Sequence, residues 1–133
     1  MQHQRLLYSF MILLVAVTYC SAQTNYTRRP NLAIPDGSLA GVTDTMNLPA
    51  IDAGMFQLVI DTLTHTWVGD LKVTLTAPNG DTVAIMNSPG DGPFGSSGHN
   101  FYGTVFSDTA SRTIESIQPG DAPHTGYWRP DGQ

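Results

Sequence analysis

Three strand-like runs joined by turns, within residues 56–86, constrain the fold of this chain more than any other feature. Apolar and polar residues nearly alternate in 56–63 and again in 71–77, which is the period of a strand with one buried face. Between 71–77 and the apolar run 82–86 lies Pro78-Asn79-Gly80-Asp81, whose residues favour a tight reversal of the backbone. The sequence therefore predicts a strand followed by a β-hairpin.

The composition favours an all-β domain. The chain has 133 residues, enough for one domain, with 13 Gly, 9 Pro and 11 acidic residues, of which only Glu115 is a glutamate. Glycine and proline are poor helix formers, and together with aspartate they are common in turns. We therefore expect one turn-rich all-β domain.

Weaker patterns predict the remaining elements of the domain. In chain order, they predict an edge strand at 39–48, a turn at 51–54, a long surface loop at 87–103, a short strand at 104–106, a strand or brief helical turn at 111–117, and loops at 120–123 and 126–130. The last loop carries Tyr127 and Trp128, which we expect to be exposed.

Residues 1–22 have the features of a secretory signal peptide. Arg5 gives a positive start, residues 6–17 are mostly apolar but short for a bilayer span, and Cys20-Ser21-Ala22 offers small residues for cleavage. An uncleaved anchor and lipid attachment at Cys20 are the alternatives. Cleavage after Ala22 predicts a secreted, extracellular domain that has no cysteine and so no disulfide.

The mature chain is expected to begin with a flexible tail at 23–33, followed by the β domain at 34–133. Within the tail, Asn25-Tyr26-Thr27 fits the acceptor pattern for N-glycosylation. Asn25 is therefore a candidate glycan site if the chain is made in a eukaryote.

The charge balance points away from nucleic acid. Without residues 1–22, five basic residues stand against eleven acidic ones, a net charge of −6. With no basic patch, we expect no nucleic-acid partner and, once the signal is removed, no membrane partner. Calcium is a candidate ligand because it binds carboxylate and carbonyl oxygens, although aspartate is also simply a good turn residue.

No motif for catalysis is present in the sequence. Ser, His and Asp all occur, but there is no G-x-S-x-G elbow, and Ser96-Ser97-Gly98-His99 falls in a predicted loop. His65, His99 and His124 lack zinc-ligand spacing. We predict no catalytic residue, and we interpret His65 as a ring held by its adjacent loop and Trp67 as a packing residue.

Four short motifs occur in an order that resembles a known domain family. Residues 65–71 read His-Thr-Trp-Val-Gly-Asp-Leu, 77–80 read Ala-Pro-Asn-Gly, 104–110 read Thr-Val-Phe-Ser-Asp-Thr-Ala, and 126–130 read Gly-Tyr-Trp-Arg-Pro. Together they resemble the P domain, also called Homo B, which follows the catalytic domain of kexin- and furin-like subtilisin proteases and occurs in bacterial secreted proteases. The resemblance covers roughly residues 34–130.

This resemblance implies a jelly-roll-like β-sandwich that performs no catalysis itself. It implies a partner, either a subtilisin-like catalytic domain or another secreted protein, whose folding and stability the module supports. It also implies bound calcium as a cofactor. Asp70 lies in the Gly-Asp-Leu motif and Asp108 in a Phe-x-Asp-x-Ala motif, which makes them the candidate calcium ligands, with Asp61 third.

Two departures from the family pattern limit what the resemblance implies. Val68 stands where the convertases have arginine, so no role of that arginine carries over. The closing strands of the family are not found before Gln133, so we expect a sandwich that is incomplete at its C-terminal end. The chain is therefore either a non-catalytic accessory module or a fragment of a secreted subtilisin-like serine endopeptidase, with the catalytic domain outside this chain.

Overall fold

The computed structural model describes residues 24–49 and 56–132, and the chain divides into two compact units, Met1–Ile51 and Asp52–Gln133. The predicted signal peptide at 1–22 and the predicted turn at 51–54 lie outside the described residues. Among the residues that are described, no helix is long and apolar enough to cross a membrane.

The described part of the first unit, 24–49, consists of exposed residues in irregular backbone. The Arg28 guanidinium donates a hydrogen bond to the Asp44 carboxylate. The predicted edge strand at 39–48 is wrong. A turn closed by the hydrogen bond from the Gly41 N–H to the Ser38 carbonyl interrupts it, and Gly41 adopts a φ of +61° that a strand does not tolerate.

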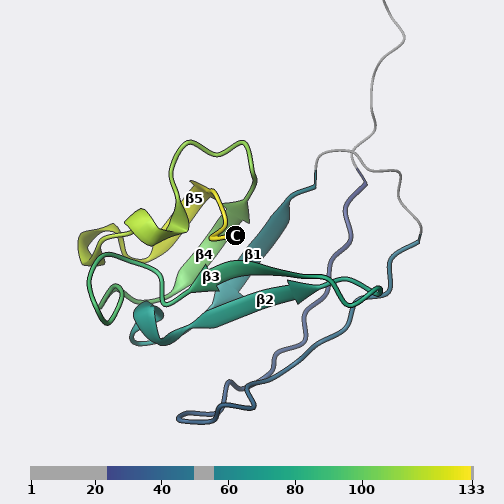
Figure 1. Ribbon diagram of the computed structural model, residues 1–133, viewed down its shortest axis with the longest axis horizontal. Coiled ribbons are helices and arrows are strands. Elements are labelled where there is room, and N and C mark those ends of the chain that lie inside the picture. Colours follow the sequence, from purple (N-terminus) through teal and green to yellow (C-terminus); the bar gives the residue numbers. More distant parts are fainter. Residues whose placement is uncertain (1–23, 50–55, 133) are drawn as a thin grey trace, which may run out of the picture. The chain divides into compact units, whose positions relative to one another are not determined.

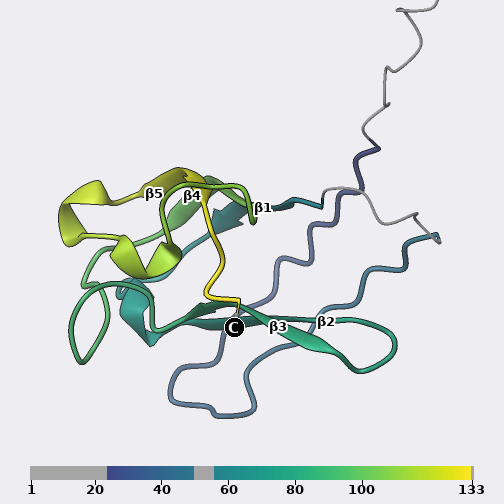
Figure 2. The same cartoon turned by 45° about the horizontal axis from the view of Figure 1, so that its top comes forward.

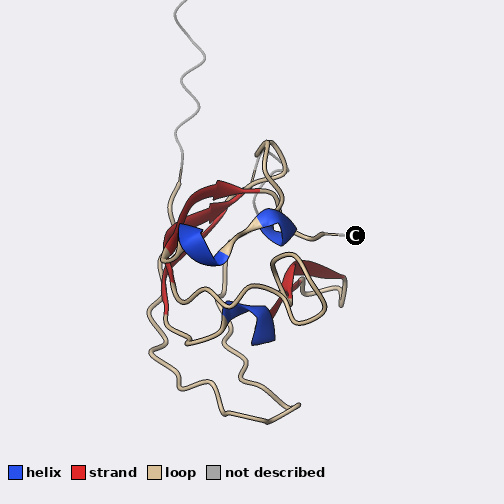
Figure 3. Ribbon diagram, turned by 90° about the vertical axis from the view of Figure 1, so that its left-hand side faces the viewer, coloured by secondary structure: helices blue, strands red, loops and turns tan. Residues whose placement is uncertain are grey.

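The second unit is an all-β fold, as predicted, with helix limited to short turns (Figures 1 and 3). In chain order its elements are β1 (Leu58–Leu63), η2 (Val68–Asp70), β2 (Lys72–Thr76), β3 (Thr82–Asn87), β4 (Phe101–Phe106), η3 (Ile114–Ser116), η4 (Pro119–Asp121) and β5 (His124–Trp128). The strands form a three-stranded sheet in the order β1-β4-β5 and a two-stranded sheet of β2 and β3.

The predicted hairpin is confirmed in β2 and β3, which pair antiparallel with Thr76 opposite Thr82. Its turn is closed by the Gly80 N–H, which donates to the Ala77 carbonyl over 2.9 Å. Gly80 has a φ of +92°, a conformation that favours glycine. The Asn79 side-chain oxygen accepts the Asp81 N–H at 3.1 Å, so the turn residues act as their types predict.

The three-stranded sheet differs more from the sequence-based prediction. β1 confirms the strand expected at 56–63. β4 begins three residues before the strand predicted at 104–106. The loop between β3 and β4 is therefore shorter than the predicted loop at 87–103. The predicted loop at 126–130 is wrong, because β5 pairs parallel with β4. Of its two aromatics, Tyr127 is exposed as predicted, whereas Trp128 is buried.

The core lies between the two sheets, which form two layers in Figure 2. Buried residues from both sheets and from η2 and η3 make up this core: Val68, Leu71, Ile85, Met86, Phe101, Phe106, Ile114, Ile117 and Trp128. The Trp128 indole N–H donates to the Thr125 carbonyl at 2.8 Å, and the Arg112 guanidinium lies 4.2 Å from the ring centre. Burial of apolar surface on this scale is the main force that holds the layers together.

Residues 111–117, predicted to form either a strand or a brief helical turn, contain the helical turn η3. An isolated bridge joins Thr113 to Arg129 just beyond β5. The predicted loop at 120–123 contains a further single turn, η4, whose Gln118 and Asp121 form a capping box.

Candidate interaction surface

An apolar row crosses the outward side of the three-stranded sheet. Val59 of β1 lies opposite Val105 of β4, and Val105 lies opposite Tyr127 of β5. Their sequence neighbours Leu58, Phe106 and Trp128 point into the core. Because neighbouring residues of a strand point to opposite faces, the row faces away from the core. Val59 is 54% exposed and Tyr127 is 64% exposed, while Val105 is half-buried between them.

A bulge in β4 adds a second aromatic residue to this side of the sheet. The register between β4 and β5 shifts between Phe101 and Thr104, where Gly103 has a φ of +57°. Phe101 and Thr104, three residues apart, are both buried, and Tyr102 between them is 39% exposed. We define the outer face as Val59, Tyr102, Val105 and Tyr127.

The loop at 88–100 is fastened to the segment around η2. The Val68 N–H donates to the Gly98 carbonyl at 2.9 Å, and the Gly69 N–H donates to the Ser96 carbonyl at 3.0 Å. The Trp67 indole N–H donates to the Phe94 carbonyl at 3.2 Å. The indole of Trp67 is therefore bonded to this loop, although the side chain is 42% exposed, and its role as a packing residue stays a prediction.

His65 and Asn100 close the base of the same loop. The His65 N–H donates to the Asn100 side-chain oxygen at 2.9 Å, and the Asn100 N–H donates to the His65 carbonyl at 3.1 Å. The half-buried His65 ring places Nδ1 at 2.8 Å from the Trp67 carbonyl oxygen. These contacts agree with the interpretation of His65 as a structural residue.

The three candidate calcium ligands lie in different elements. Asp61 is in β1, Asp70 ends η2 and Asp108 follows β4, and all three are exposed. Across residues 24–49 and 56–132, no three His, Cys, Asp or Glu side chains gather so that they could hold a metal ion. These three aspartates thus do not form a shared carboxylate site, and calcium binding remains a prediction. Asn25, the candidate glycan site, is exposed.

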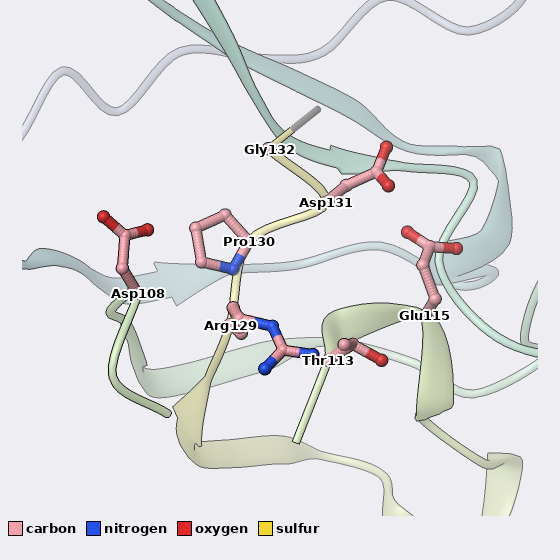
Figure 4. Close-up of a pocket in the computed structure, with 7 residues that line it drawn as sticks. All are labelled: Asp108, Thr113, Glu115, Arg129, Pro130, Asp131 and Gly132. Atoms are coloured by element: carbon pink, nitrogen blue, oxygen red, sulfur yellow. The ribbon is translucent and has the colours of Figure 1, made fainter. Parts of the chain in front are cut away.

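A pocket of about 480 Å³ lies beside the end of β5 (Figure 4). Its lining residues are Asp108, Thr113, Glu115, Arg129, Pro130, Asp131 and Gly132. Figure 4 shows the Glu115 and Asp131 carboxylates on one side of the 129–132 segment and the Asp108 carboxylate on the other. Burial, with a smaller effect from the charge of Asp131, raises the pKa of Glu115. No sequence pattern pointed to this pocket, because it brings together residues from separate turns.

The structure also shows where the serines and histidines considered as catalytic residues lie. Ser96 is buried and its Oγ accepts the Gly98 N–H at 3.1 Å, whereas Ser97 and His99 are exposed. His124 lies near Ser96, and a Cβ added at Gly98 would be 3.2 Å from Ser96 Oγ and 2.6 Å from His124 Nε2. No hydrogen bond joins Ser96 to His124 within the described residues, so the pair lacks the nucleophile–base contact of a triad.

The comparison with known families agrees with the motifs and with the sheets. The family model of the proprotein convertase P-domain matches residues 55–128, a segment that contains every strand from β1 to β5. No curated protein and no solved structure matches the chain. Because the family match spans more than half of the sequence, the chain belongs to the proprotein convertase P-domain family.

Proposed function

We propose that this chain is a secreted, non-catalytic accessory domain that docks on a partner protein through its outer face. The observation that supports docking is the row of Val59, Val105 and Tyr127, which continues across three strands. Single exposed apolar residues are ordinary on a protein surface, but a joined apolar and aromatic patch is typical of an interface. Tyrosine is also enriched at interfaces, where its ring packs and its hydroxyl stays hydrated.

A subtilisin-like catalytic domain is the partner that the family match favours, with another secreted protein as the alternative. The charge of the chain adds one requirement. Because the chain without residues 1–22 has 11 acidic residues and five basic ones, a neutral or basic partner surface is favoured over an acidic one. In this arrangement the partner performs the chemistry, and the P domain stabilises the folded state of the partner by binding it.

Co-expression with a subtilisin-like catalytic domain from the same organism tests this proposal. We expect the chain to increase the yield of soluble, active protease. Val59→Asp should remove that increase, because it places a charge within the apolar row. Val83→Asp is the matched control, since Val83 is an exposed valine (45%) in β3 of the other sheet. Equal yields with the two variants would count against the outer face.

A second candidate function is favoured by the same family match. The chain is then part of a secreted subtilisin-like serine endopeptidase, and its biological role is proteolysis carried out by residues outside this sequence. The sequence of the full transcript separates the two proposals. An upstream subtilisin domain in the same reading frame supports this second function, and a separate short reading frame supports the first.

Calcium binding and secretion form part of the proposal and rest on the sequence. Because Asp61, Asp70 and Asp108 lie apart, a calcium ion at Asp70 or Asp108 would also need backbone carbonyl and water oxygens as ligands. Sites with few carboxylate ligands bind calcium weakly, in the range of extracellular modules. Detection of the chain in the culture medium, with residues 1–22 removed, tests secretion.

A further inference from the structure

His124, the first residue of β5, is fully buried without a partner for its ring. The side chain has no solvent exposure, and neither Nδ1 nor Nε2 has a hydrogen-bond partner among the described residues. A neutral imidazole always carries one N–H donor, so at least one polar hydrogen is buried and unsatisfied here. Such a group costs free energy, and buried polar side chains without partners are uncommon.

Two elements enclose the His124 ring. The Phe101 ring of β4 lies 5.2 Å away, centre to centre, and the backbone of Gly98 in the 88–100 loop lies against Nε2. The contact with Gly98 is so close that a Cβ at that position would lie 2.6 Å from Nε2. The His124 N–H also donates to the Asn100 carbonyl at 2.9 Å, so the residue ties β5 to the end of the loop.

Few charged groups face the His124 ring. From η4, the Asp121 carboxylate favours the protonated ring, and from the loop, His99 disfavours it. β4 contributes the Phe101 ring and the Thr104 hydroxyl, which already donates to the His124 carbonyl at 2.8 Å. Burial is the largest influence, and it lowers the pKa of His124 below the ordinary value of 6.5.

We propose that His124 is an acid-sensitive latch, whose protonation releases the 88–100 loop from β4 and β5. A protonated imidazole carries two N–H donors and a positive charge, and in the closed arrangement neither ring nitrogen has a hydrogen-bond partner among the described residues. The ring gains water most readily if the loop over it opens, because irregular loops open at lower cost than paired strands. The 88–100 loop carries Phe94, which is 75% exposed, so its release also moves a large apolar surface residue.

The direction of the pH dependence follows from proton binding. In the open state His124 binds a proton near its ordinary value of 6.5, and in the closed state it binds one only at lower pH. The latch is therefore fully closed above about pH 6.5. As the pH falls toward the lowered pKa, the equilibrium constant for closing decreases by up to about tenfold per pH unit. This inference does not depend on any docking partner.

Hydrogen exchange of the purified chain tests the latch directly. The amides of Val68 and Gly69 donate to the loop carbonyls of Gly98 and Ser96, so they report whether the loop is closed. Between about pH 7.5 and about pH 5, we expect their protection factors to fall, by up to about 30-fold, while amides of the β2–β3 hairpin keep theirs. An equal loss of protection at Val68, at Gly69 and in the hairpin would overturn the proposal that only the loop is released.

Histidine variants and a ring titration complete the test. His124→Leu should abolish the acid-induced loss of protection, and His99→Gln, at an exposed histidine in the same loop, should retain it. If His124→Leu does not fold, NMR titration of the His124 ring in the unaltered chain decides the matter. A ring that titrates at or above pH 6.5, or a His124→Leu chain that keeps the acid response, would overturn the proposal.

Discussion

The backbone of Gly69 lies against the backbone of Phe94, so a Cβ at position 69 would collide with the Phe94 carbonyl oxygen. The same Cβ would lie 2.8 Å from the carbonyl carbon of Gly95. Gly69 is itself buried in η2 and donates its N–H to the 88–100 loop. The glycine of the Gly-Asp-Leu motif is therefore required for close approach of two backbone segments, and its role is packing.

Gly69→Ala should strongly destabilise the domain. Because the clash is with backbone atoms, the loop must shift, and we expect a loss of about 3 kcal/mol in the free energy of unfolding. Gly120→Ala is the control, since a Cβ at position 120 would meet no atom within 4 Å, and it should change stability by less than about 0.5 kcal/mol. Urea unfolding measures both variants, and equal stability of the two would contradict the close approach.

The two sides of the three-stranded sheet should respond differently to truncation. Phe106→Ala removes a side chain that is 2% exposed in the core, and it should cost about 3–5 kcal/mol. Val105→Ala, one residue earlier on the outward side, should cost about 1 kcal/mol or less because Val105 is only half-buried. Thermal unfolding measures the loss of stability in both variants. A larger loss in Val105→Ala than in Phe106→Ala would contradict the assignment of the two faces of β4.

Local patterns were sufficient to predict the hairpin and the all-β class. The alternation in β2 and the Asn79-Gly80 turn depend on neighbouring residues, so both are visible in the sequence. β5 was missed because its five residues include Thr125 and Gly126, and because its parallel partner is reached only after η3 and η4. The edge strand at 39–48 was predicted from a weak alternation, and Gly41 interrupts that segment with a turn.

The outer face and the His124 site were beyond sequence reasoning for a related reason. Val59, Val105 and Tyr127 are neighbours only through the pairing of three strands that are distant in the chain. His124 was weighed as a zinc ligand by its spacing, whereas its property in the fold is burial against Gly98 and Phe101. Both features depend on the register of β4 and β5, which the sequence pattern did not contain.

Glu115→Gln should stabilise the domain at neutral pH and not at acid pH. The raised pKa of Glu115, caused by burial and then by Asp131, means that the folded state holds the proton more tightly than the unfolded state. Stability is therefore highest below the unfolded pKa and falls as the pH rises through the raised folded pKa. Because the side chain is partly exposed, we expect a gain of only about 0.5 kcal/mol at pH 7. A gain that persists unchanged below about pH 4 would contradict this assignment.

Calcium should raise the melting temperature of the chain only at high concentration. If weak ligation at Asp70 or Asp108 holds an ion, calcium at tenfold over its dissociation constant adds about 1.4 kcal/mol of stability. Asp70→Asn or Asp108→Asn should remove the increase, and Asp81→Asn in the β2–β3 turn should retain it. Thermal melts with millimolar calcium and with chelator measure this, and identical melts would exclude the calcium proposal.

The most direct test of the proposed function is a binding titration of the chain against a subtilisin-like catalytic domain from the same organism. Tyr127→Ala should weaken binding by at least about 30-fold, as expected when a large aromatic residue that anchors an interface is truncated. Phe94→Ala, at an exposed aromatic residue on the 88–100 loop, should leave the dissociation constant nearly unchanged. Equal affinities of the unaltered chain and Tyr127→Ala, or a loss confined to Phe94→Ala, would contradict docking through the outer face.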